Sequence, residues 1–349
     1  MRMHNAENER IKRRYLEILK EADGASEATI DAVAAALARF EGSTNYKPFR
    51  AFREEQAAAF KRKLEAHRNE RTGQPLSLTT RKHMLKALAN FFTWLSQEPG
   101  YRKLSRSDAR FFKLSRNDAR AADAPRPRRV PTLAQIEHVL ATMPVATVGD
   151  RRNRALVAAA LVTGARVGAL ASAQVRHIDL VEGMFLNDGR TMNVKYGKTF
   201  PTWFFPVSDR ALAILTEWVN HLRSEAMFGE GDPLFPATAV APGQTSKLFE
   251  AAGLSRAFWA GTSPIRAIFK AAFAAAGVPY ANPHSIRHTL TEHGQRLYRN
   301  DIERLKAWSQ NLGHESLLTT IKSYGAVSQY RQAEIMKDAP SVTGGGTAA

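Results

Sequence analysis

The chain has 349 residues, more than one domain usually holds, so two domains are the expectation. Lysine and arginine total 50 against 33 acidic residues, and the net charge of +17 indicates a polyanionic partner. Nucleic acid is favoured over a membrane because no apolar run approaches the length of a span, and the lack of cysteine excludes disulfides, thiolate chemistry and cysteine-based zinc fingers.

The first hundred residues show helical periodicity and almost no strand pattern, so a small helical bundle is expected. Their start is charged and lacks the apolar segment of a signal peptide, which predicts a cytoplasmic location. A strongly basic helix is expected from Phe52 to His67. Before it, Ser26 is a candidate N-cap for a helix with apolar positions at three- and four-residue steps: Ile30, Val33, Leu37 and Phe40.

A third helix of the bundle is expected to begin at Ser77 or Thr79. Its core stripe consists of Met84, Leu88, Phe91, Phe92 and Leu95. A basic helix face is usually an ordinary solvated surface, but the net charge of this chain favours contact with DNA phosphates. The candidate DNA-binding residues on this helix are Arg81, Lys82 and Lys86.

Residues 113–131 form a basic, proline-containing stretch that predicts an extended linker between two domains. Three of its arginines, Arg126, Arg128 and Arg129, are further candidates for DNA contact. The segment Leu104–Arg110 nearly recurs ten residues later as Leu114–Arg120. Two copies do not make a solenoid, so a local duplication is the simpler interpretation.

The second half opens with Thr132-Leu-Ala-Gln135, a capping box ahead of an apolar helical stripe. A second helix is expected from about Arg151 to Val162, ending at Gly164, with Arg166 at the start of the next short helix. An isolated arginine at such a place would be interpreted as a capping or surface residue.

Between Met184 and Val207 the pattern changes, and Asn187-Asp-Gly189 predicts a turn in a small antiparallel sheet. This sheet carries Lys195-Tyr-Gly-Lys198, whose lysines are also consistent with an ordinary exposed hairpin. Strand-like residues lie on both sides of these lysines: Met192, Val194, Trp203, Phe204, Phe205 and Val207. Two helical core stripes follow, without visible chemistry: Leu212, Leu215, Trp218 and Leu222, then Ile265, Ile268, Phe269 and Phe273.

Asn282-Pro-His-Ser-Ile-Arg-His288 predicts a helix that Asn282 caps and Pro283 opens. Three-residue spacing places His284 and Arg287 on one face, near the positive end of the helix dipole. A rival interpretation makes His284, His288 and Glu292 metal ligands. It ranks lower because Ser285 stands where a zinc-protease helix has its glutamate, and because Arg287 would repel a cation.

The last helix follows Asp301 and leads to Leu312-Gly-His314, where Gly313 is expected to end it. Tyr324 comes ten residues after His314, and Tyr330 is a nearby competitor. Two guanidiniums can fork onto phosphodiester oxygens, two imidazoles can donate hydrogen bonds or move protons, and one phenol can attack phosphorus. The side chains that fit this chemistry are Arg166, Arg287, His284, His314 and Tyr324.

In order and spacing, these pieces resemble the tyrosine recombinases, the phage-integrase family, over about residues 130–340. The quoted motifs are Thr163-Gly-Ala-Arg166, His284-Ser-Ile-Arg287, Leu312-Gly-His314 and Tyr324. The resemblance implies that Tyr324 is the nucleophile and that the arginines and histidines hold the phosphate. At the position three residues after Arg166, where the family commonly has an acidic residue, this chain has Ala169.

The resemblance also implies a lysine that protonates the departing 5′ oxygen as a general acid. Family patterns of the form Lys-x-x-Lys favour Lys195, whereas counting back from Pro206 favours Lys198. Lys195 is preferred, with Lys198 as the alternate.

The implied fold is mainly α with a small antiparallel β-sheet. A helical core-binding domain (1–112) is followed by the linker (113–131), an α+β catalytic domain (132–340) and a disordered tail (341–349).

The implied activity is site-specific DNA recombination through a 3′-phosphotyrosyl intermediate, without ATP or a metal ion. The implied partners are double-stranded recombination sites and further copies of the chain in a homo-tetramer, placed on the bacterial nucleoid when DNA is bound. A type IB topoisomerase and a catalytically silent DNA-binding protein are the alternatives.

Overall fold

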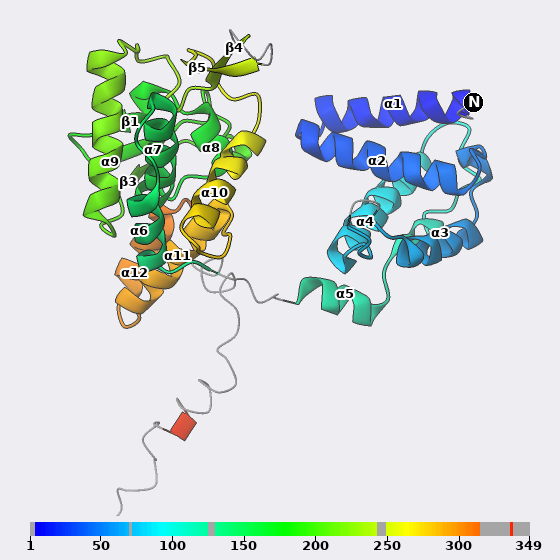
Figure 1. The fold of residues 1–349 in the computed structure, drawn as a ribbon. Helices are drawn as coiled ribbons and strands as arrows, with labels where there is room; N and C mark the ends of the chain where they lie inside the picture. Colours follow the sequence, from blue (N-terminus) through cyan, green and yellow to red (C-terminus); the bar gives the residue numbers. More distant parts are fainter. Residues whose placement is uncertain (1–3, 70–71, 125–129, 243–248, 315–335, 338–349) are drawn as a thin grey trace, which may run out of the picture. The chain divides into compact units, whose positions relative to one another are not determined.

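The computed structural model describes residues 4–69, 72–124, 130–242, 249–314 and 336–337. The chain divides into two compact units, Met1–Arg126 and Pro127–Ala349, and each unit has its own hydrophobic core. The predicted fold class is confirmed, because the described residues are mainly helical with two small antiparallel sheets (Figure 1). None of the helices in the described ranges has the length and apolar character needed to cross a lipid bilayer.

The first unit is a helical bundle, as predicted. Ser26 and Ser77 cap the second and fourth helices by accepting hydrogen bonds from the backbone N–H groups of Thr29 (3.4 Å) and Thr80 (3.0 Å). The elements are α1 (Ala6–Glu21), α2 (Glu27–Ser43), α3 (Glu54–Ala66), α4 (Leu78–Leu95) and α5 (Arg116–Asp123), with 3-10 turns at Phe49–Ala51 and Asp108–Phe112.

The core of this unit is built around the ring of Phe40 on α2. Because each buried phenylalanine stabilises a fold by roughly 2 kcal/mol, the cluster fixes how the helices pack. Four rings surround Phe40 edge-on, with centroids 5.3 to 5.9 Å away: Phe52, Phe60, Phe92 and Phe112.

The expectation of an extended chain from residue 113 to residue 131 is wrong for Arg116–Asp123, which forms helix α5. Ser115 caps this helix by accepting a hydrogen bond of 3.0 Å from the backbone N–H of Asp118. The hydroxyl of Thr79 on α4 also donates to the carbonyl oxygen of Ala122 (3.2 Å), which holds α5 against the bundle. Ser115 is a typical N-cap residue, and this local preference for a helix start prevailed over the basic, proline-containing composition that had indicated an extended chain.

The second unit surrounds the long helix α7, whose residues from Ala155 to Thr163 are all buried. The predicted capping box of Thr132 and Gln135 opens α6. Leu212 on α9 is 39% exposed, so the predicted core stripe is narrower than expected. The helices are α6 (Leu133–Thr142), α7 (Val148–Thr163), α8 (Val167–Ser172), α9 (Asp209–Asn220), α10 (Ser263–Ala275), α11 (Pro283–Leu297) and α12 (Ile302–Asn311), with a π-helical turn at His221–Glu225 after α9.

The predicted small antiparallel sheet is confirmed, with β2 (Met184–Asn187) and β3 (Phe200–Trp203) inside the predicted segment. A further short strand before that segment, β1 (Ile178–Asp179), completes the order β1-β2-β3. In the register of β2 and β3, Phe185 lies opposite Thr202. The strand assignment is wrong for Met192 and Val194, which are buried in the connection between β2 and β3, and for Phe204, Phe205 and Val207, which follow β3. A second hairpin, which the sequence did not indicate, pairs β4 (Thr238–Pro242) with β5 (Phe249–Leu254).

Helices α11 and α12 pack closely at one glycine. A β-carbon placed on Gly294 would lie 2.4 Å from Cδ1 of Trp308, so only glycine fits there. The indole N–H of Trp308 donates to the carbonyl oxygen of Leu290 (2.9 Å). This contact fixes the direction in which α12 approaches His314.

Candidate active site

Arg166 stands at the junction of α7 and α8. Helix α7 ends at Gly164, whose backbone is left-handed (φ 57°), and Arg166 is the N-cap of α8. A β-carbon on Gly164 would lie 2.8 Å from a methyl carbon of Leu312 and 3.0 Å from one of Leu290. Glycine is therefore required both by the backbone conformation and by the packing. The turn brings Arg166 close to the segment that carries His314.

Arg287 joins two of the predicted motifs. Its guanidinium is buried, donating from Nη1 to the carbonyl oxygen of Gly164 and from Nη2 to the carbonyl oxygen of Leu312. These two acceptors lie 123 and 25 residues away from Arg287 in the sequence. One side chain thus holds the segments of Arg166 and His314 together.

The Arg166 guanidinium is half-buried, and burial lowers its pKa. Among the residues that the structure describes, no carboxylate and no hydrogen-bond acceptor contacts it. A half-buried cation without a counter-charge is costly, and it becomes favourable when an anion such as a phosphate binds. The arrangement therefore leaves Arg166 available for an anionic ligand.

His314 follows the end of α12 and is oriented by Ser309, a residue that sequence reasoning missed. Its backbone N–H donates to the carbonyl oxygen of Ser309 (3.2 Å), and its Nδ1 lies 3.5 Å from the Ser309 hydroxyl. Burial, followed by the charges of Arg287, Arg166 and His288, lowers the pKa of His314 to about 4. The imidazole is therefore neutral at pH 7, and these groups act on one another within one site.

His284 and His288 form a pair on α11. Asn282 caps this helix by accepting from the backbone N–H of Ser285 (3.2 Å), as predicted, and Pro283 occupies the first turn. The two imidazole rings meet edge to face with centroids 4.9 Å apart. His284 is exposed, while His288 is half-buried and contributes to the low pKa of His314. In the sequence His288 was considered as a metal ligand in the rival interpretation.

The connection between β2 and β3, residues 188–199, carries both candidate lysines and is called the lysine loop below. Asp188 anchors it with one carboxylate, which accepts hydrogen bonds from the backbone N–H of Arg190 (3.0 Å), the hydroxyl of Thr191 (3.0 Å) and the hydroxyl of Thr199 (3.3 Å). Chiefly because of the main-chain bond from Arg190, the pKa of Asp188 lies well below its usual range. The sequence showed Asp188 only as part of a turn.

Two glycines close the neck of the lysine loop. A β-carbon on Gly189 would lie 1.9 Å from the carbonyl oxygen of Gly197, so the two backbone segments touch. The backbone N–H of Gly189 also donates to the Thr199 hydroxyl (3.0 Å). The loop is consequently a closed turn rather than an open hairpin.

The lysine loop is also tied to the helix that Arg166 begins. The backbone N–H of Asn193 donates to the hydroxyl of Ser172 on α8 (2.7 Å), and a β-carbon on Gly168 would lie 3.1 Å from the carbonyl oxygen of Asn193. Ala169, which stands at the commonly acidic family position, is 1% exposed and packs in the core of this unit. The loop and the first arginine therefore share one rigid support.

Lys195 and Lys198 lie on either side of a left-handed turn. Lys195 is exposed, and its Nζ lies 4.6 Å from the ring centre of Tyr196. Tyr196 has a φ of 64° and is 78% exposed. Lys198 is half-buried and has an extended backbone (φ −76°, ψ 138°).

Asn311 links β3 to the end of α12. Its side-chain oxygen accepts from the backbone N–H of Trp203, and its amide nitrogen donates to the carbonyl oxygen of the same residue, both at 2.8 Å. The hydroxyl of Thr202 donates to the backbone carbonyl oxygen of Asn311 (3.0 Å). These bonds fix the position of the segment leading to His314 relative to the sheet.

The predicted nucleophile Tyr324 and its competitor Tyr330 lie outside the described residues, and so do Arg126, Arg128 and Arg129. The structure describes the other candidate catalytic side chains. It brings Arg166, Arg287, His288 and His314 together.

The candidate DNA-binding residues of α4 differ in their surroundings. Arg81 is half-buried and lies 3.6 Å from a carboxylate oxygen of Glu65. Lys82 contacts both carboxylate oxygens of Asp123 on α5 at 2.6 Å. Lys86 is exposed, and no ion pair is found for it in the described part of the chain.

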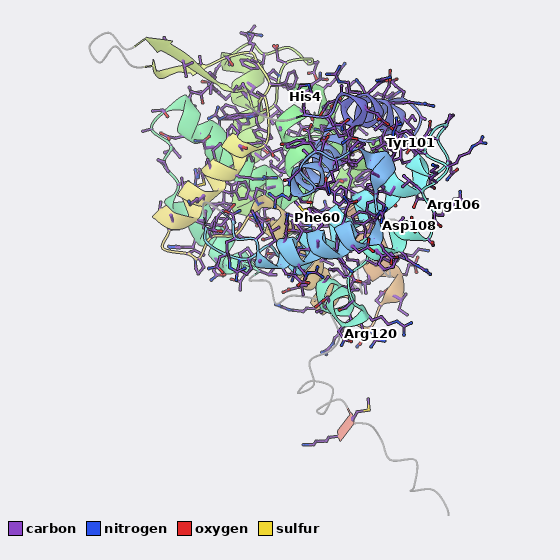
Figure 2. All side chains as sticks on the ribbon, turned by 90° about the vertical axis from the view of Figure 1, so that its right-hand side faces the viewer. His4, Phe60, Tyr101, Arg106, Asp108 and Arg120 are labelled. Atoms are coloured by element: carbon purple, nitrogen blue, oxygen red, sulfur yellow. The ribbon has the colours of Figure 1, made fainter. Side chains whose placement is uncertain are left out.

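The duplicated segment presents its arginines to solvent. Arg106 and Arg120 lie at the periphery of the helical unit in Figure 2, and Arg110 and Arg116 are also exposed. For the rival metal hypothesis, no group of three or more histidine, aspartate or glutamate side chains within the described ranges is arranged to hold a metal ion.

Comparison with protein families decides the classification. The model of the phage integrase family matches residues 130–331, more than half of the chain. The chain belongs to the phage integrase family. This phage integrase region contains α6 to α12 and all the candidate catalytic residues.

Curated relatives of this phage integrase family member are tyrosine recombinases named XerC. The protein from Lactobacillus leichmannii is 27% identical over 186 residues, covering 52% of this chain and 54% of the relative. One from Lactobacillus delbrueckii subsp. bulgaricus is 28% identical over 169 residues, covering 48% of each chain. The chain thus spans about half the length of the curated relatives it matches.

Solved structures support the fold of this phage integrase family member. An integrase from the Tn1549 transposon in complex with a circular intermediate DNA has a TM-score of 0.59 and 15% identity, covering 94% of this chain and 99% of that one. A λ integrase dimer bound to a COC′ core site has a TM-score of 0.57 and 18% identity, covering 92% and 98%. At these identities the comparison shows the fold alone.

Proposed function

We propose that the chain is a site-specific DNA recombinase that cuts and rejoins DNA through a 3′-phosphotyrosyl intermediate. The observation that carries the proposal is the pair of hydrogen bonds from Arg287 to the carbonyl oxygens of Gly164 and Leu312. These bonds gather two guanidiniums and a neutral imidazole at one place. Family membership and the net charge of +17 support DNA as the substrate.

Arg166 and Arg287 hold the scissile phosphate by donating N–H groups to its non-bridging oxygens. The phenol oxygen of Tyr324 attacks phosphorus as its proton passes to the imidazole of His284, and the bond from phosphorus to the 5′ oxygen breaks. Lys195 donates a proton to the departing oxygen, so the products are a 3′-phosphotyrosyl bond and a free 5′ hydroxyl. Attack by a 5′ hydroxyl from a partner duplex reverses these steps and releases the phenol. Phosphodiester energy is conserved, so the cycle consumes no nucleotide.

In the protein without DNA the low pKa of His314 keeps its imidazole neutral at pH 7, which suits it to hydrogen bonding. A neutral imidazole donates one hydrogen bond to a phosphate oxygen and adds no positive charge. The charge that develops in the transition state is then stabilised by Arg166 and Arg287, with exposed His284 available for a further hydrogen bond or proton transfer. Ser309 orients His314 for its role.

The assembly that exchanges strands contains four copies on two duplex sites. One structural relative is a λ integrase tetramer bound to a Holliday junction, with a TM-score of 0.54, 18% identity and coverage of 89% of this chain and 80% of that one. Four active sites match the four strands that two duplexes must exchange. In the cell the protein works in the cytoplasm, on the nucleoid when it is bound to DNA.

The test uses a pool of nicked duplexes, in which cleavage releases a short fragment and traps the covalent adduct. We expect wild-type protein to form an adduct that survives denaturation, and sequencing of the trapped DNA to reveal the preferred site. Tyr324→Phe abolishes the adduct, whereas the matched Tyr330→Phe retains it. A complete absence of adduct would sink the enzymatic proposal. Relaxation of supercoiled DNA without sequence preference, by a monomer, would favour the topoisomerase alternative.

A further inference from the structure

The turn between the two candidate lysines contains an unusual backbone conformation. Tyr196 has a φ of 64° and the following Gly197 a φ of 61°, so two consecutive residues are left-handed. Glycine adopts this conformation easily, but a tyrosine is strained in it. Tyr196 is also 78% exposed, so burial of its ring in the core does not offset the strain. Strain of this kind persists where the surrounding structure holds it in place, and such residues are enriched at functional sites.

The surroundings hold Tyr196 in this conformation. The neck of the lysine loop is closed where Gly189 meets Gly197, and Asp188 binds the backbone and side chains on both sides of the loop. The bond between Asn193 and Ser172 fixes the loop to α8. The loop therefore holds the backbone of Tyr196, and with it the base of the side chain, in one position.

The ring of Tyr196 faces Lys195. The ammonium nitrogen of Lys195 lies 4.6 Å from the ring centre, within the range of a cation–π interaction. A lysine side chain has four rotatable bonds, and an exposed one samples many positions of its ammonium group. The ring reduces this freedom and specifies where the proton donor stands.

Tyr196 is also close to the phosphate-binding part of the site. Burial lowers the pKa of Arg166, and an ionised Tyr196 phenol would raise it, which indicates that the two side chains are neighbours. The bond from Asn193 to Ser172 also joins the loop to α8, the helix that Arg166 begins. Lys195 and Arg166 are therefore carried by the same support.

We propose that Tyr196 is a positioning residue that holds the ammonium of Lys195, rather than that of Lys198, as the proton donor to the departing 5′ oxygen. This inference rests on the proposed function, and it resolves the choice that the sequence left between the two lysines. The proton moves from Lys195 Nζ to the 5′ oxygen as the bond to phosphorus breaks. Tyr196 touches neither reacting atom and acts only through Lys195.

The experiment compares two nicked substrates that differ at one atom. In the second substrate, sulfur replaces the bridging 5′ oxygen of the scissile phosphate, and a thiolate leaves without needing a proton because thiols are far more acidic than alcohols. A variant that has lost only proton donation is slow on the oxygen substrate and recovers on the sulfur substrate. A variant damaged in any other way is slow on both.

We expect Tyr196→Leu to slow adduct formation on the oxygen substrate roughly tenfold, a part of the range that general-acid catalysis supplies. On the sulfur substrate its rate returns to that of the wild type. Lys195→Ala shows the same recovery after a larger loss, and Tyr196→Phe, which keeps the ring, stays near the wild type on both substrates. In Lys198→Ala, the ratio of the two rates remains at the wild-type value.

Tyr46→Leu is the matched control, because Tyr46 is also left-handed (φ 58°) but belongs to the helical unit. Its rate ratio should equal that of the wild type. Equal slowing of Tyr196→Leu on both substrates, or recovery by sulfur in Lys198→Ala, would overturn the assignment of Tyr196 and Lys195. A wild-type protein that forms no adduct with either substrate would instead contradict the proposed function.

Discussion

Arg287 donates a hydrogen bond to the carbonyl oxygen of Gly164, two residues before Arg166. One candidate catalytic arginine thus supports the backbone that presents the other. The two guanidiniums have different structural roles, since Arg287 is buried and bonded to main-chain oxygens, while Arg166 is half-buried at a helix start. This difference leads to separable effects on stability and catalysis.

We expect Arg287→Ala to lower the free energy of unfolding by roughly 2–4 kcal/mol, because two buried carbonyl oxygens lose their donors. Arg166→Ala should change stability by less than about 0.5 kcal/mol while reducing adduct formation by at least roughly a hundredfold. Urea unfolding and single-turnover cleavage measure the two effects. Equal stability losses in both variants would contradict this division, and Arg287→Lys provides a folded comparison.

The low pKa of His314 makes stability depend on pH. In the unfolded chain this histidine takes up a proton near pH 6.5, whereas in the folded protein it does so only near its pKa of about 4. Between these values the unfolded state binds more protons, so the stabilising contribution is complete above about pH 6.5 and is lost as the pH falls toward 4. His314→Asn should flatten the dependence of the urea midpoint on pH. An NMR titration that gave His314 an ordinary pKa would refute the prediction.

Gly313 is required by contact as well as by conformation. It has a φ of 67°, and a β-carbon there would lie 2.4 Å from Cζ of Phe200. We expect Gly313→Ala to destabilise the fold by about 2–3 kcal/mol, and the added change Phe200→Leu to recover the steric part. Gly277→Ala is the control, because Gly277 has a φ of 65° and nothing within 4 Å of its β-carbon, so only about 1 kcal/mol of backbone strain is expected. Thermal unfolding measures all four proteins.

Loss of the Asp188 carboxylate should loosen the lysine loop. We expect trypsin to cleave Asp188→Ala after Lys195 or Lys198 roughly ten times faster than the wild type, because local opening becomes easier. Adduct formation should slow at the same time. Asp179→Ala is the matched control, because Asp179 accepts backbone N–H bonds in the neighbouring β1–β2 turn. A uniform rise in proteolysis across the chain would argue against a local effect.

Two lysines of α4 should differ in their contribution to DNA binding. Lys82 is already paired with Asp123, whereas Lys86 is exposed. Lys86→Gln should reduce the slope of log binding constant against log salt concentration by about 0.9, the value of one phosphate contact, and Lys82→Gln should reduce it less. Fluorescence anisotropy between about 50 and 200 mM salt measures these slopes. Identical slopes for the two variants would exclude the distinction.

Local signals in the sequence predicted the helix starts well. Ser26, Ser77, Thr132, Asn282 and Asp301 all cap the expected helices, because a cap depends on residues within one turn. Alternating apolar residues were less reliable at Met192 and Val194. These two residues are buried in a turn that the Asp188 side chain stabilises by hydrogen bonds. The spacing of apolar residues does not distinguish such a buried turn from a strand.

The candidate site depends on contacts that no local pattern contains. The motif residues were recognisable by type and spacing, but the bonds from Arg287 to Gly164 and Leu312 span much of the chain. The same holds for Asn311, which binds Trp203 across 108 residues. Supporting residues of this kind emerge only when the elements have packed.

The duplicated segment shows where the length of the chain can change by one repeat. In each copy a hydrogen bond joins a serine to the aspartate three residues later, Ser105 with Asp108 and Ser115 with Asp118, and each pair lies at the start of a helical turn. A ten-residue module of this kind extends a surface by up to about 15 Å when fully helical. Insertion of one module would alter the reach of this arginine-bearing edge over a polyanion, whereas loss of the first copy would also remove Leu104 and Ala109 from the core of the helical unit. Length variation at this point would therefore change the spacing of these arginines along a bound polyanion.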